Sequence, residues 1–321
     1  MRRTGICDLF GIRYPIIQGG LEWIASAEIA AAVSNAGALG TISPTAGMTH
    51  GDDLVKNLRD QIRKARSLTD KPFAVNLPIQ TAELKPVLDA ALGAVIEEGV
   101  KIVTTSAGNP ALTTGRLKSA GLKVLHVVAS VKHAEGAEKS GVDAVVAEGC
   151  ESGGHTGFDE MPTFALVPQV VDAVSVPVVA AGGIADARGL VAALALGAEG
   201  VQIGTRFVAT HECLAHRDFK EEIIKASDTA TVVTMRKINP IRELKNEFTA
   251  KVLEMENNGT SAAALSAFVG DVRVWAGEVE GRMDDGELPC GIIAGMIKEI
   301  MNAGDVVRSI VDGYDRVVAG L

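Results

Sequence analysis

The chain has 321 residues, is 47% hydrophobic and carries a formal net charge of −9 at pH 7. The negative charge would repel nucleic-acid phosphates and the 4% aromatic content leaves few stacking residues, so we exclude a nucleic-acid-binding role. The chain lacks a membrane-length apolar run and a signal-peptide pattern, and its four cysteines are widely spaced. We therefore expect a cytoplasmic protein with reduced thiols, no membrane insertion and no metal site.

Short apolar runs alternate with longer amphipathic segments through the first two thirds of the chain, which is typical of parallel βαβ units. The expected helices are 27–36, 52–66, 84–98, 111–120, 131–140, 166–174 and 187–196. The expected strands are 15–18, 39–43, 73–77, 102–105, 123–128, 144–148, 177–181 and 200–204.

These strands are continuously apolar, as strands covered on both faces are. Eight such units favour an α/β fold of the (β/α)₈ TIM-barrel type. The alternative is an open doubly wound sheet, which would need a GxGxxG motif after its first strand. The sequence there is Gln18-Gly19-Gly20-Leu21-Glu22-Trp23, which does not match.

The character of the sequence changes after the eighth strand. Residues 216–265 are charged and helix-prone, and residues 261–289 are rich in small side chains. We expect a barrel over 1–215, a smaller helical lobe over 216–289 beside the barrel mouth, and C-terminal helices over 290–321 that return to the barrel.

Two glycine-containing loops follow the seventh and eighth expected strands. Gly182-Gly183 and Gly204-Thr205 would expose backbone N–H groups at the rim, where barrels commonly bind a phosphate. Glycine allows the backbone to approach the anion closely, and Thr205 adds a hydroxyl. A simple chain turn is the alternative reading of Gly182-Gly183.

In the stretch AVVAEGCESGGHTG (144–157), an apolar run is followed by Glu148 and then by Gly153-Gly154 and His155. A histidine on such a loop can transfer a proton or donate a hydrogen bond, so His155 is the candidate catalytic residue. Nothing fixes Glu148 and Glu151 at the separation that a glycosidase pair needs.

Three other positions are weaker candidates. Asn76, at the end of the third strand, could bind the edge of a heteroaromatic ring or could simply form a turn before Pro78. Trp23 could close one side of a flat ligand or could only pack. His126 lies within an apolar strand and could face the barrel lumen.

Taken together, the motifs QGG, VNL, AEGxExGGHxG, AAGGIAD and QIGTRF resemble the nitronate monooxygenase (2-nitropropane dioxygenase) family of FMN-dependent barrels. That group includes flavin-type enoyl-ACP reductases and NADH:quinone reductases. The resemblance implies His155 as the catalytic histidine. It also implies FMN contacts at Gly20, Leu21, Asn76, Glu148, Gly153, Gly154, Gly182, Gly183, Gln202, Gly204 and Thr205.

Two branch features point to the NAD(P)H-using reductases. The first loop is similar to their QGGMxW, and Glu148 stands where typical nitronate monooxygenases have Gln. The stretch Ile42-Ser43-Pro44, however, lacks the glycine run of enoyl reductases.

Three functions follow for testing. The first is an FMN oxidoreductase that passes hydride from NADH or NADPH to an enoyl-thioester or quinone-type acceptor. The second is a nitronate monooxygenase that uses O₂ without a nicotinamide. The third is a nucleotide-binding barrel without turnover. The expected partner is a small-molecule or acyl-thioester substrate, and a homodimer is left open.

Overall fold

The computed structural model describes residues 1–49, 51–79, 85–270 and 272–321. Eight strands form one sheet in the order β1-β9-β8-β6-β5-β4-β3-β2, and each adjacent pair is parallel. A parallel bridge between Ile17 and Leu39 joins β1 to the β2 end, so the sheet closes. The predicted TIM barrel is confirmed. Its strands are β1 Ile16–Gln18, β2 Gly40–Ile42, β3 Phe73–Pro78, β4 Ile102–Ser106, β5 Lys123–Val128, β6 Ala144–Glu148, β8 Val178–Ala181 and β9 Gly200–Ile203.

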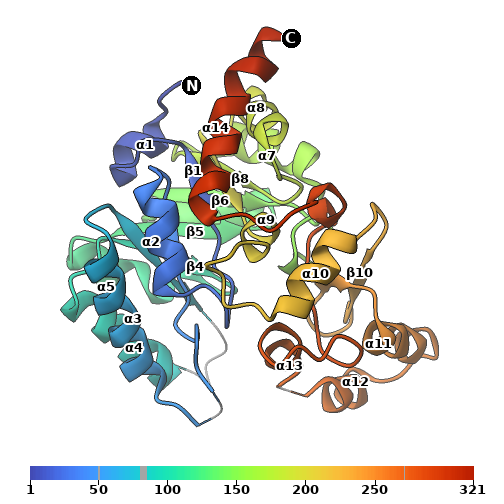
Figure 1. Ribbon diagram of the computed structural model, residues 1–321. Helices are drawn as coiled ribbons and strands as arrows, with labels where there is room; N and C mark the ends of the chain where they lie inside the picture. The colour runs from blue at the N-terminus through green and yellow to red at the C-terminus, as the bar shows by residue number, and fades with distance from the viewer. Residues whose placement is uncertain (50, 80–84, 271) are drawn as a thin grey trace.

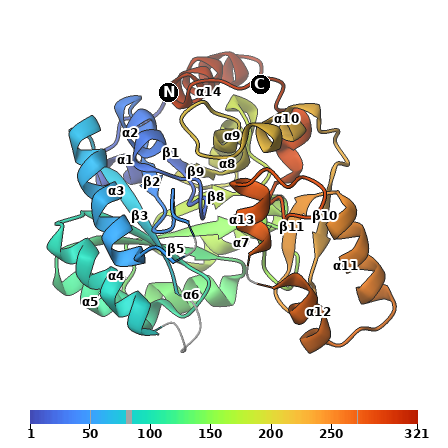
Figure 2. The ribbon, with the colours of Figure 1, turned by 60° about the horizontal axis from the view of Figure 1, so that its bottom comes forward.

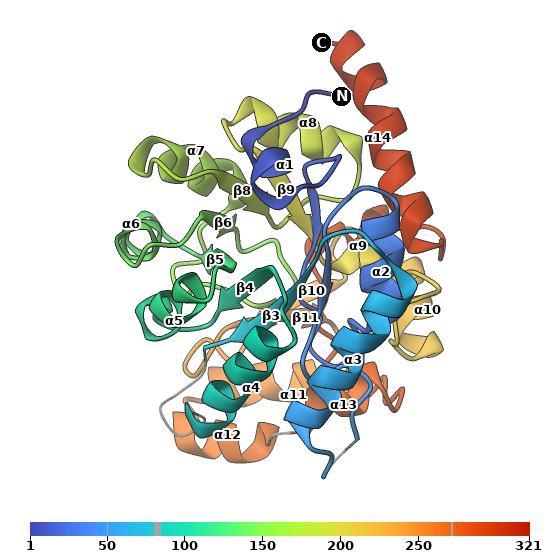
Figure 3. The same ribbon diagram turned by 90° about the vertical axis from the view of Figure 1, so that its left-hand side faces the viewer.

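A ring of helices covers the outer face of the barrel (Figure 3). A large apolar core fills the layer between strands and helices, and a second core fills the lumen. The short helix α1 (Gly5–Phe10) contributes Ile6, Cys7 and Phe10 to the lumen core. The ring consists of α2 Ala27–Asn35, α3 Leu54–Leu68, α4 Lys85–Glu97, α5 Thr114–Ser119, α6 Val131–Lys139, α7 Thr163–Ala173 and α8 Ala187–Ala195.

Three helix starts differ from the expected ones. The helix expected from residue 52 begins at Leu54, after the Asp53 cap. The helix expected from residue 111 begins instead at Thr114, after a 3₁₀ turn, η2 (Pro110–Leu112), because Pro110 opens that turn after the Asn109 cap. The helix expected from residue 166 begins three residues earlier, at Thr163. Residue 84, the expected start of the third helix, lies outside the described residues.

The segment 216–289, which we call the lobe, lies beside the barrel (Figure 2). It contains the expected helices. It also contains an antiparallel pair of strands, β10 (Thr231–Thr234) and β11 (Ile241–Leu244), which the prediction of a helical lobe did not include. β11 also pairs with β7 (Gly154–His155), which belongs to the loop after β6. The lobe helices are α10 Arg217–Lys225, α11 Glu247–Asn257, α12 Ala262–Val269 and α13 Arg273–Glu278.

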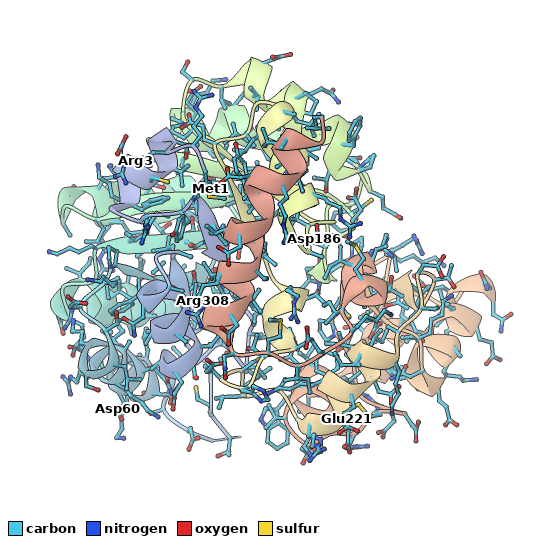
Figure 4. The ribbon with its side chains drawn as sticks, turned by 45° about the horizontal axis from the view of Figure 1, so that its top comes forward. Met1, Arg3, Asp60, Asp186, Glu221 and Arg308 are labelled. Carbon is cyan, nitrogen blue, oxygen red and sulfur yellow. The ribbon has the colours of Figure 1, made fainter. Side chains whose placement is uncertain are left out.

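After the 3₁₀ segment η3 (Ile292–Met296), the terminal helix α14 (Ala303–Ala319) packs against α8 and α2 of the barrel (Figure 1). Both chain ends lie near α14, and Met1 is beside it (Figure 4). The ammonium group of Met1 is 3.4 Å from Asp315 Oδ1. No helix within the described residues is long and apolar enough to cross a membrane.

Candidate active site

A cavity of about 1160 Å³ opens at the carboxyl ends of the barrel strands. This volume exceeds the roughly 300–1,000 Å³ that is typical of a site for one small ligand. Every site residue expected from the sequence lines it: Gly20, Leu21, Asn76, Glu148, Gly153, Gly154, His155, Gly182, Gly183, Gln202, Gly204 and Thr205.

The loops after β8 and β9 present unused hydrogen-bond donors to this cavity. The backbone N–H groups of Gly183, Gly204 and Thr205 donate to no other group in the described part of the chain. The hydroxyl of Thr205 accepts a hydrogen bond from Gly291 N at 2.9 Å and lies beside the buried thiol of Cys290. Gly182 and Gly183 have φ angles of 89° and 73°, which favour glycine. These donors suit an anion such as a phosphate.

Gly20, in the loop after β1 and therefore next to the β9 loop, lies close to Asn76 of β3. A Cβ atom on Gly20 would be 2.6 Å from Asn76 Cγ, so only glycine fits beside this amide. Asn76 is within β3, paired with Thr104, and is not part of a turn. The turn-forming alternative is therefore wrong. Trp23 does not line the cavity and packs against the core between strands and helices, as the packing alternative predicts.

Glu148 ends β6 and faces the cavity. Burial raises the pKa of its carboxyl to about 7, and the nearby hydroxyl of Ser152 opposes the rise. Near neutral pH, Glu148 therefore exists partly in the protonated form, which can donate a hydrogen bond to a ligand.

Glu151 has a different environment from Glu148. Its Oε2 accepts hydrogen bonds from Thr163 N at 2.9 Å and from Thr163 Oγ1 at 2.8 Å. The backbone oxygen of Glu151 accepts from Ile292 N at 3.0 Å. Glu151 thus joins the loop after β6 to the start of α7 and to the start of η3.

His155 lies on β7, where it pairs with Ile241 of the lobe. Its ring lines the cavity and remains accessible to solvent. Desolvation by the surrounding protein lowers the pKa of the imidazole, and the carbonyls of Pro240 and Asn239 oppose this effect. The neutral ring can donate or accept one hydrogen bond above the cavity floor.

The lobe and the segment after it contribute cavity residues that the sequence did not reveal: Asn239, Ile241, Glu278, Pro289 and Gly291. None belongs to a recognisable motif. Arg242 supports the site indirectly, since its Nε donates to Cys150 O at 2.7 Å. Within the described residues, no cluster of three or more His, Cys, Asp or Glu side chains could hold a metal ion.

A family model described as nitronate monooxygenase matches residues 3–313. The chain belongs to this family. A probable nitronate monooxygenase of Staphylococcus saprophyticus is 38% identical, over 79% of this chain and 82% of the relative. As a member of the nitronate monooxygenase family, the chain is an oxidoreductase.

Other relatives of the chain have different names. A Rhodococcus jostii protein named as a hydroxy-methyl-oxo-octahydro-indene-carboxyl-CoA dehydrogenase is 33% identical, over 99% of this chain and 97% of the relative. The structure of FabK from Thermotoga maritima superposes with a TM-score of 0.91 at 42% identity, covering 100% of this chain and 98% of the other. The structure of nitroalkane oxidase from Streptomyces ansochromogenes superposes with a TM-score of 0.84 at 27% identity, covering 98% of this chain and 99% of the other.

Proposed function

We propose that this family member is an FMN-dependent oxidoreductase whose cofactor lies in the cavity at the barrel mouth. The observation that carries the proposal is the set of unused donors at Gly183, Gly204 and Thr205. They would bind the FMN phosphate. Because Gly20 has no side chain to displace the Asn76 amide, that amide can face the flat ring system. When bound, FMN accepts a hydride from one substrate and delivers electrons to another.

The side chains around this space would control protons and orientation. Asn76 and Gln202 can each donate and accept at the ring edge. Glu148, when protonated, would donate a hydrogen bond without placing a negative charge beside the ring. His155 would donate a hydrogen bond or a proton to the acceptor substrate from the side of the lobe.

We propose NADH or NADPH as the hydride donor and an enoyl thioester or a quinone-type compound as the acceptor. The motif resemblance to the NAD(P)H-using reductases supports this choice, as does the relative that is named for a carboxyl-CoA compound. The cavity volume of about 1160 Å³ leaves room for a substrate beside the cofactor. We also retain the division into 1–215, 216–289 and 290–321 as a proposal.

A second candidate is a nitronate monooxygenase, which needs no nicotinamide. The description of the family and the likeness to nitroalkane oxidase favour it. The same His155 would then bind the nitronate oxygen.

An anaerobic absorbance spectrum before and after addition of NADH or NADPH tests these proposals. We expect a yellow protein whose flavin bands bleach within seconds. Bleaching by propyl-2-nitronate but by neither nicotinamide would favour the monooxygenase. Failure to bind FMN would contradict both proposals.

A further inference from the structure

The cavity continues beyond the barrel mouth onto the outer face of the sheet. We call this extension the side arm. It exists because the β4–β5 connection offers only the turn η2 and the six-residue α5, whereas α4 and α6 have 13 and 9 residues. The residues along it are Leu88 and Ala91 of α4, His126 and Val128 of β5, and Gly136 and Ala137 of α6.

His126 faces this side arm and not the lumen. Its neighbour Leu125 belongs to the lumen core, whereas Val124 and Val128 belong to the core between strands and helices. Since side chains alternate along a strand, His126 shares the outer face with Val124 and Val128. The prediction that His126 could face the barrel lumen is therefore wrong.

The His126 ring has one occupied and one unoccupied nitrogen. Its Nδ1 is 2.8 Å from Thr105 Oγ1, and the residue is only 3% exposed. No other hydrogen bond of either residue's side chain exists among the described residues. A buried hydroxyl without an acceptor is unfavourable, so Thr105 donates to Nδ1, which assigns the ring hydrogen to Nε2. Nε2–H is then a donor without a hydrogen-bond partner among the described residues, on a side chain that lines the cavity.

The surroundings of this donor restrict the ligand. The walls of the side arm are small and apolar, and Gly136 is exposed, so the side arm reaches solvent. Near that outer end, Lys132 lines the cavity and makes no ion pair within the described residues. A dinucleotide would leave its many polar groups unpaired against such walls. A slim, largely apolar chain with isolated carbonyls and an anionic end would match them.

We propose that the side arm binds the phosphopantetheine chain of an acyl thioester, with His126 Nε2–H donating to an amide carbonyl of that chain. The inference rests on the proposed function, since it names the class of acceptor for the same site. His126 is then a specificity-determining residue, and Thr105 positions it.

Crotonyl thioesters of increasing length test the proposal with the FMN-loaded protein. The series is the ethanethiol thioester, which has no amide, then the N-acetylcysteamine, pantetheine and coenzyme A thioesters. We expect His126→Leu to lower kcat/KM for the pantetheine thioester about tenfold, the effect of one hydrogen bond. We expect the ethanethiol thioester to change less than twofold. Equal losses across the series, or no loss in any member, would overturn the proposal.

Two matched pairs exclude a general structural effect. Thr105→Val should reproduce the His126→Leu pattern, whereas Thr105→Ser keeps the hydroxyl and should not. His211→Leu changes an exposed histidine that does not line the cavity and should leave the ethanethiol-to-pantetheine ratio unchanged. A His211→Leu effect equal to that of His126→Leu would contradict the assignment.

A binding measurement separates this inference from the proposed function. Calorimetry with pantetheine needs no turnover, and His126→Leu should weaken its binding about tenfold. If no thioester is reduced but this loss is found, the side arm stands and the reductase proposal fails. If thioesters are reduced and neither binding nor kcat/KM depends on His126, the side arm fails alone. A higher kcat/KM for a crotonyl-carrier protein than for crotonyl-CoA would identify the carrier protein as the source of the chain, and the reverse would identify CoA.

Discussion

Glu151 and Thr163, twelve residues apart, are joined by the carboxylate of one and both hydrogen-bond donors of the other. The hydroxyl of Thr163 is also 3.0 Å from Gly182 O. This contact therefore connects the loop that carries His155 with the loop that presents donors to an anion. Pro162, at the N-cap of α7, offers no side-chain cap, so Glu151 supplies it from outside the helix.

Replacement of Glu151 by alanine should destabilise the protein by about 1–2 kcal/mol, because the amide of Thr163 loses its acceptor. Glu151→Gln keeps one acceptor oxygen and should cost less. Urea unfolding measures both. Equal stability of the alanine variant and the wild type would show that water replaces the carboxylate fully.

Replacement of Gly20 by alanine should weaken FMN binding at least tenfold, because the new Cβ would displace Asn76. Gly19→Ala is the matched control, since its Cβ would meet Gln202 at 3.5 Å, an ordinary contact. Fluorescence titration with FMN measures both affinities. If both variants bind FMN equally well, Asn76 does not contact the cofactor.

Replacement of His155 by alanine should lower kcat by roughly 10²–10⁴-fold, the usual contribution of a proton donor or acceptor. FMN affinity should change little, because the phosphate donors belong to other loops. Single-turnover kinetics and FMN titration give the two values. An equal loss of FMN binding would assign His155 to the cofactor site and not to catalysis.

We expect Glu243 to make the folded protein less stable as the pH rises. Burial raises the pKa of its carboxyl from 4.5 to about 7. Between these values, the folded protein holds a proton that the unfolded chain releases. The free energy of unfolding therefore falls as pH rises through this window and levels off above about pH 7.

The variant Glu243→Gln removes this titration and keeps an oxygen for Thr234 Oγ1, which donates to Glu243 at 2.6 Å. At pH 8 we expect the free energy of unfolding of this variant to exceed that of the wild type by at most about 3 kcal/mol, and at pH 4.5 we expect no difference. Urea unfolding at both pH values measures it. The exposed Glu254→Gln is the control. A variant with the pH dependence of the wild type would refute the assignment.

The barrel could be predicted from sequence because each of its strands is a local apolar run. The hairpin of β10 and β11 could not, because the sequence IREL places the charged Arg242 and the buried Glu243 in a strand. The two-residue β7 exists only through pairing with residues more than 80 positions away. No local pattern encodes such a contact.

The residues of the candidate site could also be predicted only in part from the sequence. Its glycine loops and His155 follow strand ends and carry motifs, so the sequence located them. The side of His126 was not readable, because the run LHVV is apolar on both sides of the histidine and shows no alternation. Gly291 lines the cavity only because the returning chain packs against Glu151, a contact with no sequence signature.

The pairing of His155 with Ile241 has a consequence for chimeric enzymes. A lobe transplanted from another family member would bring its own strand to the histidine, and would thereby change where the ring points over the cavity. The barrel and the lobe are therefore not independent modules for redesign. An exchange that preserves activity would need to carry the segment 149–157 together with the lobe, so that strand and histidine remain matched.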